Sequence, residues 1–254
     1  MTALLEVTEH ETHCLLAMDD GKANALSFDM LASLNAGLDQ AAATGKVVII
    51  TGRPGKFCAG FDLSVMGQGG EDAARLLHQG AEVASRLLTF QTPVVLAVSG
   101  HALAMGALLC LSADYRIGAE GDYKLGLNEV AIGMTLPWFG VELARARLTQ
   151  GHLDQAVGLA RIYEPAGAVE AGFLDEAVPA GELGGRAADM AAALATLNMD
   201  AHRNTKQRVR EPLSERLELA LQRDFAAASH GSSGQRGEVE RSTLAAEIER
   251  QKDA

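Results

Sequence analysis

The chain has 254 residues, of which 48 % are hydrophobic and 4 % aromatic, so it can bury one large core of mainly aliphatic side chains. Its formal net charge of −11 repels nucleic acid and anionic membranes, and we expect neither as a partner. The three cysteines, Cys14, Cys58 and Cys110, fit neither a disulfide framework nor a zinc site. The N-terminus has no basic start followed by an apolar run, so the sequence favours a reducing cytoplasm.

Strands and helices alternate over the first 140 or so residues. A period-two pattern over Leu4–Met18 predicts two short strands around His10–His13, and Ser27 is a good N-cap for a helix through Leu38. Apolar runs predict buried strands at 46–51 and 93–98, and 115–118 looks like a third strand, with helices at about 72–89 and after Ala104. This alternation argues for an α/β fold whose apolar strands are covered on both faces.

After Gly140 the pattern is helical only, with segments at 142–148, 153–161, 184–197, 205–222 and 238–251 and a loop at 229–234. The long alanine-rich segments look too extended to fold back wholly on one core. We therefore expect part of this tail to make subunit contacts, and we expect the protein to be an oligomer.

Two glycine-bearing segments, Phe57–Leu63 and Gly100–Gly106, each follow an apolar strand and lead towards a helix. Two such turns can aim backbone N–H groups at a single oxygen atom, as an enzyme needs in order to stabilise an enolate. Taken singly, each segment is more often just a turn, so the prediction rests on their combination.

A third segment, Gly126–Trp138, carries one carboxylate, Glu129, between leucine, valine, isoleucine and methionine residues. Apolar surroundings disfavour the charged form, so the pKa of Glu129 should be raised, which suits a general acid or base near neutral pH. The alternative is an ordinary surface glutamate on a turn.

Three segments in this order, Gly52–Leu63, Pro93–Gly106 and Gly126–Trp138, resemble the crotonase superfamily, the enoyl-CoA hydratases and isomerases. The similarity extends to Lys22–Leu26 and, more weakly, to Ala168–Glu176. It implies an α/β spiral of repeated strand–strand–helix units over residues 1–195. It also implies a C-terminal helical trimerisation region at 196–254, in a homotrimer or a dimer of trimers.

The same resemblance implies an acyl-CoA thioester as substrate, with coenzyme A as part of that substrate and no separate cofactor or metal. It places the thioester oxygen between the N–H groups of Phe61 and Met105, where most relatives have glycine in place of Met105. Residues implied for the coenzyme A path are Lys22, Ala23, Ala59, Asp62 and Leu63, and Trp138 is expected to wall the acyl pocket or the core. Candidates for the phosphate-binding charges are Lys22, Arg53 and Lys56, and secondly Lys206, Arg208 and Arg210.

The reaction is predicted from the carboxylates. In this family, a hydratase that resembles the prototype uses two glutamates; here the first would fall at Leu108, and only the second, Glu129, is present. One base and two N–H donors suit the Δ3,Δ2-enoyl-CoA isomerases, which the chain resembles most in motif. The alternatives are an enoyl-CoA hydratase and a crotonase-fold protein that binds a CoA thioester with altered chemistry or none. We assign no role to His101, or to Cys58, which has no visible activating partner.

Overall fold

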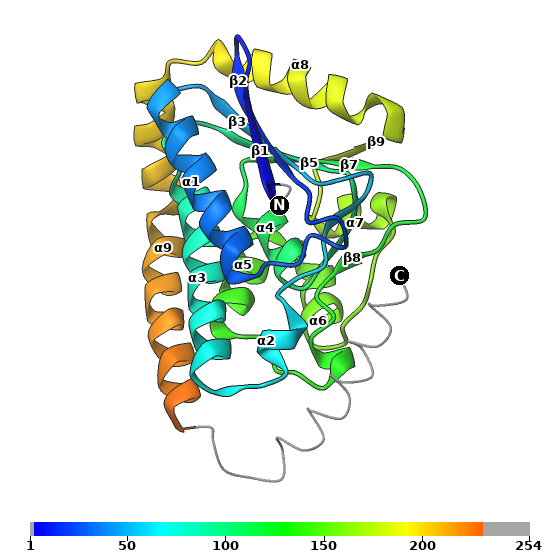
Figure 1. The fold of residues 1–254 in the computed structure, drawn as a ribbon, viewed down its shortest axis with the longest axis vertical. Helices are drawn as coiled ribbons and strands as arrows, with labels where there is room; N and C mark the ends of the chain where they lie inside the picture. The colour runs from blue at the N-terminus through cyan, green and yellow to red at the C-terminus, as the bar shows by residue number, and fades with distance from the viewer. Residues whose placement is uncertain (1–2, 231–254) are drawn as a thin grey trace.

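The computed structural model describes residues 3–230, and its strands form two sheets (Figure 1). The six-stranded sheet has the order β1-β2-β3-β5-β7-β9, and its pairs are parallel except β1 with β2. Its strands are Leu5–Glu9, His13–Met18, Val47–Thr51, Val94–Val98, Tyr115–Ala119 and Glu176–Val178. The second sheet is parallel, with the order β4-β6-β8, formed by Gly55–Cys58, Gly100–Leu103 and Leu125–Gly126.

The chain repeats one unit, because each of three strands of the large sheet is followed by a strand of the small sheet and then by helix. This holds for β3, β4 and α3 (Gly70–Thr89), with α2 (Leu63–Met66) between them, and for β5, β6 and α4 (Met105–Ser112). β7 and β8 lead in the same way to α5 (Trp138–Arg147). The predicted spiral of strand–strand–helix units is therefore confirmed.

The central strands bury both faces. Val48 and Ile50 of β3 point into the main core, whereas Val47 and Ile49 pack in a second apolar cluster. That second cluster is covered by α8 (Leu183–Ala195), which lies across the end of the molecule at the top of Figure 1. The remaining helices are α1 (Phe28–Thr44), α6 (Gln150–Val157), α7 (Pro165–Ala171) and α9 (Met199–His230). Ser27 caps α1 as predicted, since its side chain accepts the N–H of Met30.

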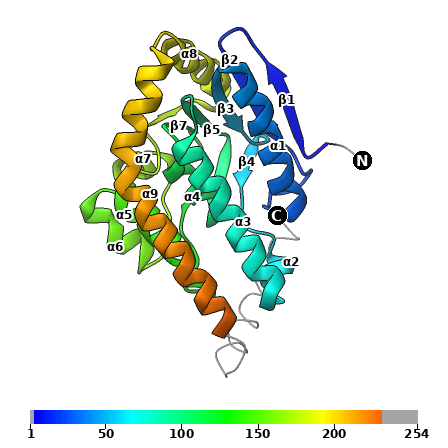
Figure 2. The same ribbon diagram turned by 90° about the vertical axis from the view of Figure 1, so that its left-hand side faces the viewer.

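The C-terminal region differs from the prediction in three ways. A strand, β9, follows α7 and extends the large sheet, so the expectation of helices alone after Gly140 is wrong. The helix α9 lies along α3 and α5 of its own chain (Figure 2), and it buries Leu213 and Leu217 in the main core. Residues 229 and 230 belong to this helix and not to a loop.

The expectation that the tail is too extended to fold back is therefore wrong for α9, which packs on its own core because its apolar stripe faces α3 and α5. The helix predicted at 238–251 and the rest of the predicted loop lie outside the described residues. The division at residue 195 stays a prediction. Within the described part of the chain, no helix is both long and apolar enough to cross a membrane.

Candidate active site

Glu129 lies at the start of a tight turn that follows β8. The backbone C=O of Glu129 accepts the N–H of Met134 at 2.8 Å, and Gly133, at a φ of 81°, closes the 3-10 turn Val130–Ile132. A left-handed residue at that point is most easily glycine. The turn holds the glutamate inward with only 7 % of its surface exposed, so Glu129 is not a surface residue.

The environment of the Glu129 carboxylate disfavours its charge. Burial raises its pKa to about 7, although a hydrogen bond from its own backbone N–H acts in the opposite direction. Its Oε2 atom has no hydrogen-bond partner among the described residues, and neither has the Oδ1 atom of Asn128. A carboxyl group that is half protonated near neutral pH can both accept and return a proton.

Glu129 faces a small cavity of about 60 Å³. Leu108, on α4, lines this cavity together with the glutamate and is 1 % exposed. The rest of the wall comes from three parts of the chain, namely Ala59, Phe61, Leu63, Met66 and Leu77, then Ala104, and then Asn128, Ile132, Met134, Thr135 and Pro137. Glu129 is therefore the one ionisable side chain among the described residues that line it.

The two glycine-bearing turns meet beside this cavity. Gly60 has a φ of 100°, and a Cβ there would lie 2.8 Å from the Cβ of Ala104 and 3.5 Å from the backbone N of Met105. Only glycine allows so close an approach. Ala104 itself has a φ of 50° and a ψ of −121°, a strained conformation for a residue with a side chain.

At each turn one backbone N–H group is not used in strand pairing or in a helix. Leu26 pairs with the Phe61 segment through the C=O of Gly60 and the N–H of Asp62. Because successive N–H groups of an extended chain point to opposite sides, the N–H of Phe61 points away from Leu26. Met105 is the first residue of α4, where an N–H has no acceptor within the helix.

The other residues predicted for substrate binding lie around the first turn, but not all line the cavity. Ala59 and Leu63 line it, and the C=O of Ala23 accepts the N–H of Ala59 at 3.1 Å. Asp62 caps α2 by accepting the N–H of Ser64 at 2.9 Å. Lys22 is exposed.

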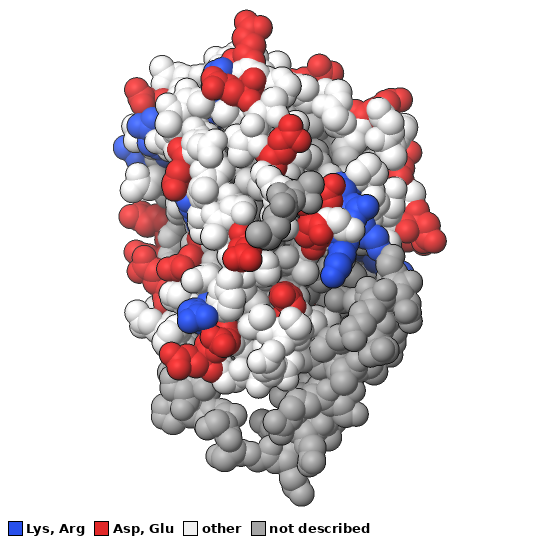
Figure 3. Space-filling view, in the orientation of Figure 1, with Lys and Arg blue, Asp and Glu red and all other residues white. Residues whose placement is uncertain are grey.

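Three predicted cations gather at the surface next to this turn. Arg53 donates to the C=O of Lys22 at 3.1 Å and forms a backbone bridge with Lys56. On the face drawn in Figure 3, a small group of basic side chains lies on the right with acidic side chains beside it, and further basic side chains lie on the left. Arg53 also lies 3.8 Å from the Asp19 carboxylate, so an acidic side chain shares this surface with the predicted cations.

Lys206 and Arg210 are internal and are not placed to bind phosphate, which corrects the expectation for them. Lys206 Nζ lies 2.6 Å from Asp114 Oδ2, and Arg210 Nη2 lies 2.8 Å from Asp114 Oδ1. Both side chains are largely buried because α9 folds against its own core, whereas Arg208 is exposed.

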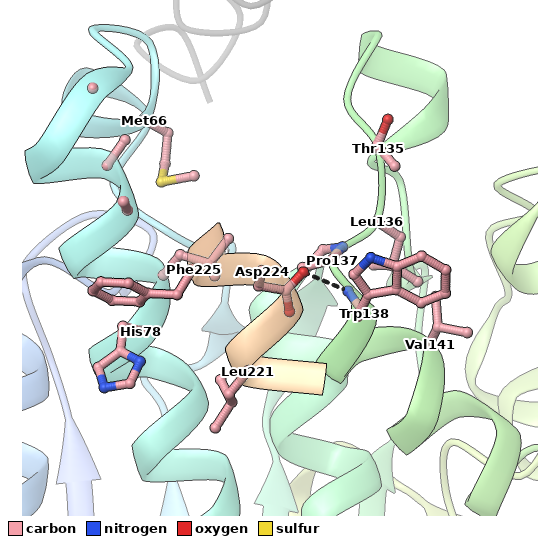
Figure 4. Close-up of a pocket in the computed structure, with 14 residues that line it drawn as sticks. Met66, His78, Thr135, Leu136, Pro137, Trp138, Val141, Leu221, Asp224 and Phe225 are labelled. Carbon is pink, nitrogen blue, oxygen red and sulfur yellow. Dashed lines mark hydrogen bonds between the residues drawn. The ribbon is translucent and has the colours of Figure 1, made fainter. Parts of the chain in front are cut away.

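Trp138 is 49 % exposed and lines a second, larger cavity next to that of Glu129 (Figure 4). His101 does not line either cavity, and its Nδ1 atom accepts the N–H of Lys124. Burial raises the pKa of the Cys58 thiol to about 12, so it is no nucleophile at neutral pH.

Several lining residues were missed from the sequence. Asn128 and Thr135 lie within the segment that drew attention to Glu129, so proximity in sequence could have suggested them. Leu77 on α3 and Asp224 on α9 had no such signal, because only the packing of these helices brings them to the cavities.

The family model described as enoyl-CoA hydratase/isomerase matches residues 8–253. The chain belongs to this family, and the fold and the placement of Glu129 agree with that membership.

Relatives bear names from both branches of the family. The chain is 29 % identical over 173 residues to "Enoyl-CoA delta isomerase 1, mitochondrial" of Rattus norvegicus, covering 67 % of this chain and 60 % of that one. It is 32 % identical over 160 residues to "Probable enoyl-CoA hydratase" of Bacillus subtilis, covering 61 % and 58 %. The match thus spans about three fifths of the length of these curated relatives.

Similarity to solved structures extends over most of the chain. The crystal structure of an enoyl-CoA hydratase/isomerase family protein from Pseudomonas syringae has a TM-score of 0.87 and 43 % identity. It covers 88 % of this chain and 97 % of that one. The spiral fold is therefore shared with a protein whose name, like the family description, includes both hydratase and isomerase.

Proposed function

We propose that this protein is a Δ3,Δ2-enoyl-CoA isomerase in which Glu129 is the single proton shuttle. The observation that carries the proposal is the pair of side chains that line the small cavity together, the carboxyl of Glu129 and the hydrocarbon of Leu108. Shifting a double bond needs one group that removes a proton and returns it elsewhere. Adding water needs a base for the water and an acid for the carbon, and Leu108 can be neither.

The proposed reaction proceeds through a dienolate. The Glu129 carboxylate removes a proton from C2 of a 3-enoyl thioester, and the electron pair spreads over C2 to C4 and the thioester oxygen. The N–H groups of Phe61 and Met105, with the positive end of α4 behind the second, stabilise the charge on that oxygen. The Glu129 carboxylic acid then returns the proton to C4, which leaves the double bond between C2 and C3.

The raised pKa of Glu129, about 7, supports this role because the same group must be a base and then an acid. We also propose that the coenzyme A phosphates lie near Lys22, Arg53 and Lys56, which come together next to the Gly60 turn. The substrate brings its coenzyme A with it, so no separate cofactor is proposed. We also propose that the protein forms a homotrimer or a dimer of trimers and acts in the cytoplasm.

The test is a pair of ultraviolet assays on the purified protein, because conjugation of the double bond with the thioester absorbs strongly. With a 3-enoyl-CoA the absorbance should rise, and with a 2-enoyl-CoA it should stay constant. Glu129→Gln should lower kcat by a factor on the order of 10³, as the loss of a general base does.

The matched control is Glu142→Gln, since Glu142 pairs with Arg216 at 3.0 Å and lines neither cavity. This variant should keep wild-type turnover. A fall of absorbance with the 2-enoyl-CoA would instead establish hydration. Full turnover by Glu129→Gln would refute the proposed role of that residue.

A further inference from the structure

A second cavity, of about 560 Å³, lies between α3, α5 and α9 (Figure 4). Its wall is mostly apolar and includes Ala74 and Leu77 from α3, Trp138 and Val141 from α5, and Leu221 and Phe225 from α9. No function given above uses this space. It is roughly nine times larger than the cavity at Glu129.

The two cavities adjoin each other. Met66, Leu77, Thr135 and Pro137 line both of them, so these four side chains form the boundary between a small compartment at Glu129 and a large one beyond it. The two compartments therefore lie side by side, as an acyl chain that extends beyond Glu129 requires.

The few polar groups in the wall of the large compartment are mostly turned to partners in the protein. The Asp224 carboxylate accepts the N–H of Trp138 at 2.8 Å and that of Phe139 at 3.1 Å, which caps the N-terminus of α5. His78 packs edge-on against Phe225 and approaches Glu82 at 3.4 Å, although its Nδ1 atom has no partner among the described residues. None of the described lining residues is a lysine or arginine, so the space does not suit the phosphates of coenzyme A.

We propose that the large compartment takes the distal part of a straight acyl chain, and that the preferred substrates are 3-enoyl-CoA thioesters of about ten to twelve carbons or more. This inference rests on the proposed function. A methylene group takes about the room of a water molecule, roughly 30 Å³, so the small compartment holds about two carbons and the large one holds ten or more. Leu221 and Phe225, which line the compartment from α9, are the residues that set the preference.

The first test is the dependence of kcat/KM on chain length, from 3-hexenoyl-CoA to 3-dodecenoyl-CoA. Burying each methylene in an apolar compartment should raise kcat/KM about fourfold, so two added carbons should give roughly tenfold or more. A kcat/KM that is flat, or that falls, between six and twelve carbons would overturn the inference while leaving the isomerase proposal intact.

Variants in the wall test whether this compartment is the cause. Ala74→Phe fills it, and should lower kcat/KM for the dodecenoyl substrate at least tenfold while leaving the hexenoyl substrate within about twofold. Leu221→Gln places an amide in the wall and should act in the same direction. The matched control is Leu219→Gln, because Leu219 is 56 % exposed on the same helix and does not line the compartment.

Turnover of the hexenoyl substrate shows in each case that the variant is folded. Equal losses with both substrates in the folded variants would count against the inference.

Binding of saturated thioesters separates this inference from the reaction itself. Titration calorimetry with hexanoyl-CoA and dodecanoyl-CoA should show at least tenfold tighter binding of the longer chain, lost in Ala74→Phe. This result would support the compartment even if no 3-enoyl-CoA were turned over, which would refute only the isomerase. Equal affinity for the two thioesters would overturn the inference whatever the reaction.

Discussion

Two carboxylates, the partly buried Asp114 and the buried Glu129, differ in what surrounds their charge. Asp114 has an ion pair with Lys206 and another with Arg210, and it also accepts the backbone N–H of Val94 at 2.8 Å. Glu129 has an oxygen without any partner among the described residues, and no other ionisable side chain among them lines its cavity.

The difference is that the Asp114 carboxylate is paired with cations, whereas the Glu129 carboxyl has no counter-charge in the described part of the chain and keeps an oxygen available for proton transfer. Around Asp114 the opposite charges compensate one another where α9 meets the sheet, although burial still lowers the pKa of Lys206 to about 8. Around Glu129 nothing compensates the charge, so the cost of burial remains as a raised pKa. Substitutions that remove or add a charge in either region test this comparison.

The largest effect on stability is expected from Asp114→Asn. This change leaves Lys206 and Arg210 buried without their counter-charge, which should lower the free energy of unfolding by about 3–5 kcal/mol. Chemical denaturation measures the loss. Turnover per folded molecule should stay near wild type, because Asp114 lines neither cavity, and a selective loss of turnover would show that the two regions are coupled.

Glu129→Gln should change stability in the opposite direction, and only at higher pH. The folded-state pKa of about 7 lies above the ordinary value of 4.5, so the folded protein binds the proton more tightly and loses stability as pH rises from about 4.5 to 7. The variant lacks this loss and should gain up to about 3 kcal/mol over wild type at pH 8, with no gain at pH 4.5. Denaturation at both pH values measures it; a gain that is the same at both would contradict the raised pKa.

The pH dependence of kcat/KM sharpens the comparison further. In the proposed reaction Glu129 acts first as a base, so activity should rise with pH, reach half its plateau near pH 7 and be about tenfold below the plateau at pH 6. Leu108→Glu places a second carboxyl in the same cavity, and mutual repulsion should shift the rise to higher pH. Leu108→Gln is the uncharged control. An unshifted profile in Leu108→Glu would mean that the group titrating is not Glu129.

The smallest effect is expected at Ala104, which lies next to the site and has a strained backbone conformation but no charge. Ala104→Gly relieves a φ of 50° but makes the unfolded chain more flexible, so stability should change by less than about 1 kcal/mol, in the stabilising direction. Thermal unfolding measures this change. A marked destabilisation would show that the methyl group matters more as packing against Gly60 than as a source of strain.

Much of the spiral was predictable because its signals are local. The apolar strands, the Ser27 cap and the buried Glu129 follow from patterns within a few residues of each other, and the structure confirms them. β9, of three half-buried residues, has too short a pattern to be recognised, since its place is fixed by pairing with β7.

The path of α9 could not be predicted for a similar reason. Its sequence shows a long helix but not which surface the helix will cover. Lys206 and Arg210 pair with Asp114, which is more than ninety residues away in the sequence. No local pattern reveals this pairing, so both cations were predicted to be available for phosphate binding. The same holds for Asp224, which reaches the N-terminus of α5 only through the packing of α9.

The walls of the two compartments come from distant parts of the chain, and this has a consequence for divergence within the family. Glu129 and the Gly60 turn belong to the spiral units, whereas Leu221 and Phe225 belong to a helix about a hundred residues later. Substitutions at Leu221 and Phe225 can therefore accumulate without changing Glu129 or the Gly60 turn. Selection can therefore change which substrates are accepted while the reaction is retained, so the two properties can evolve independently.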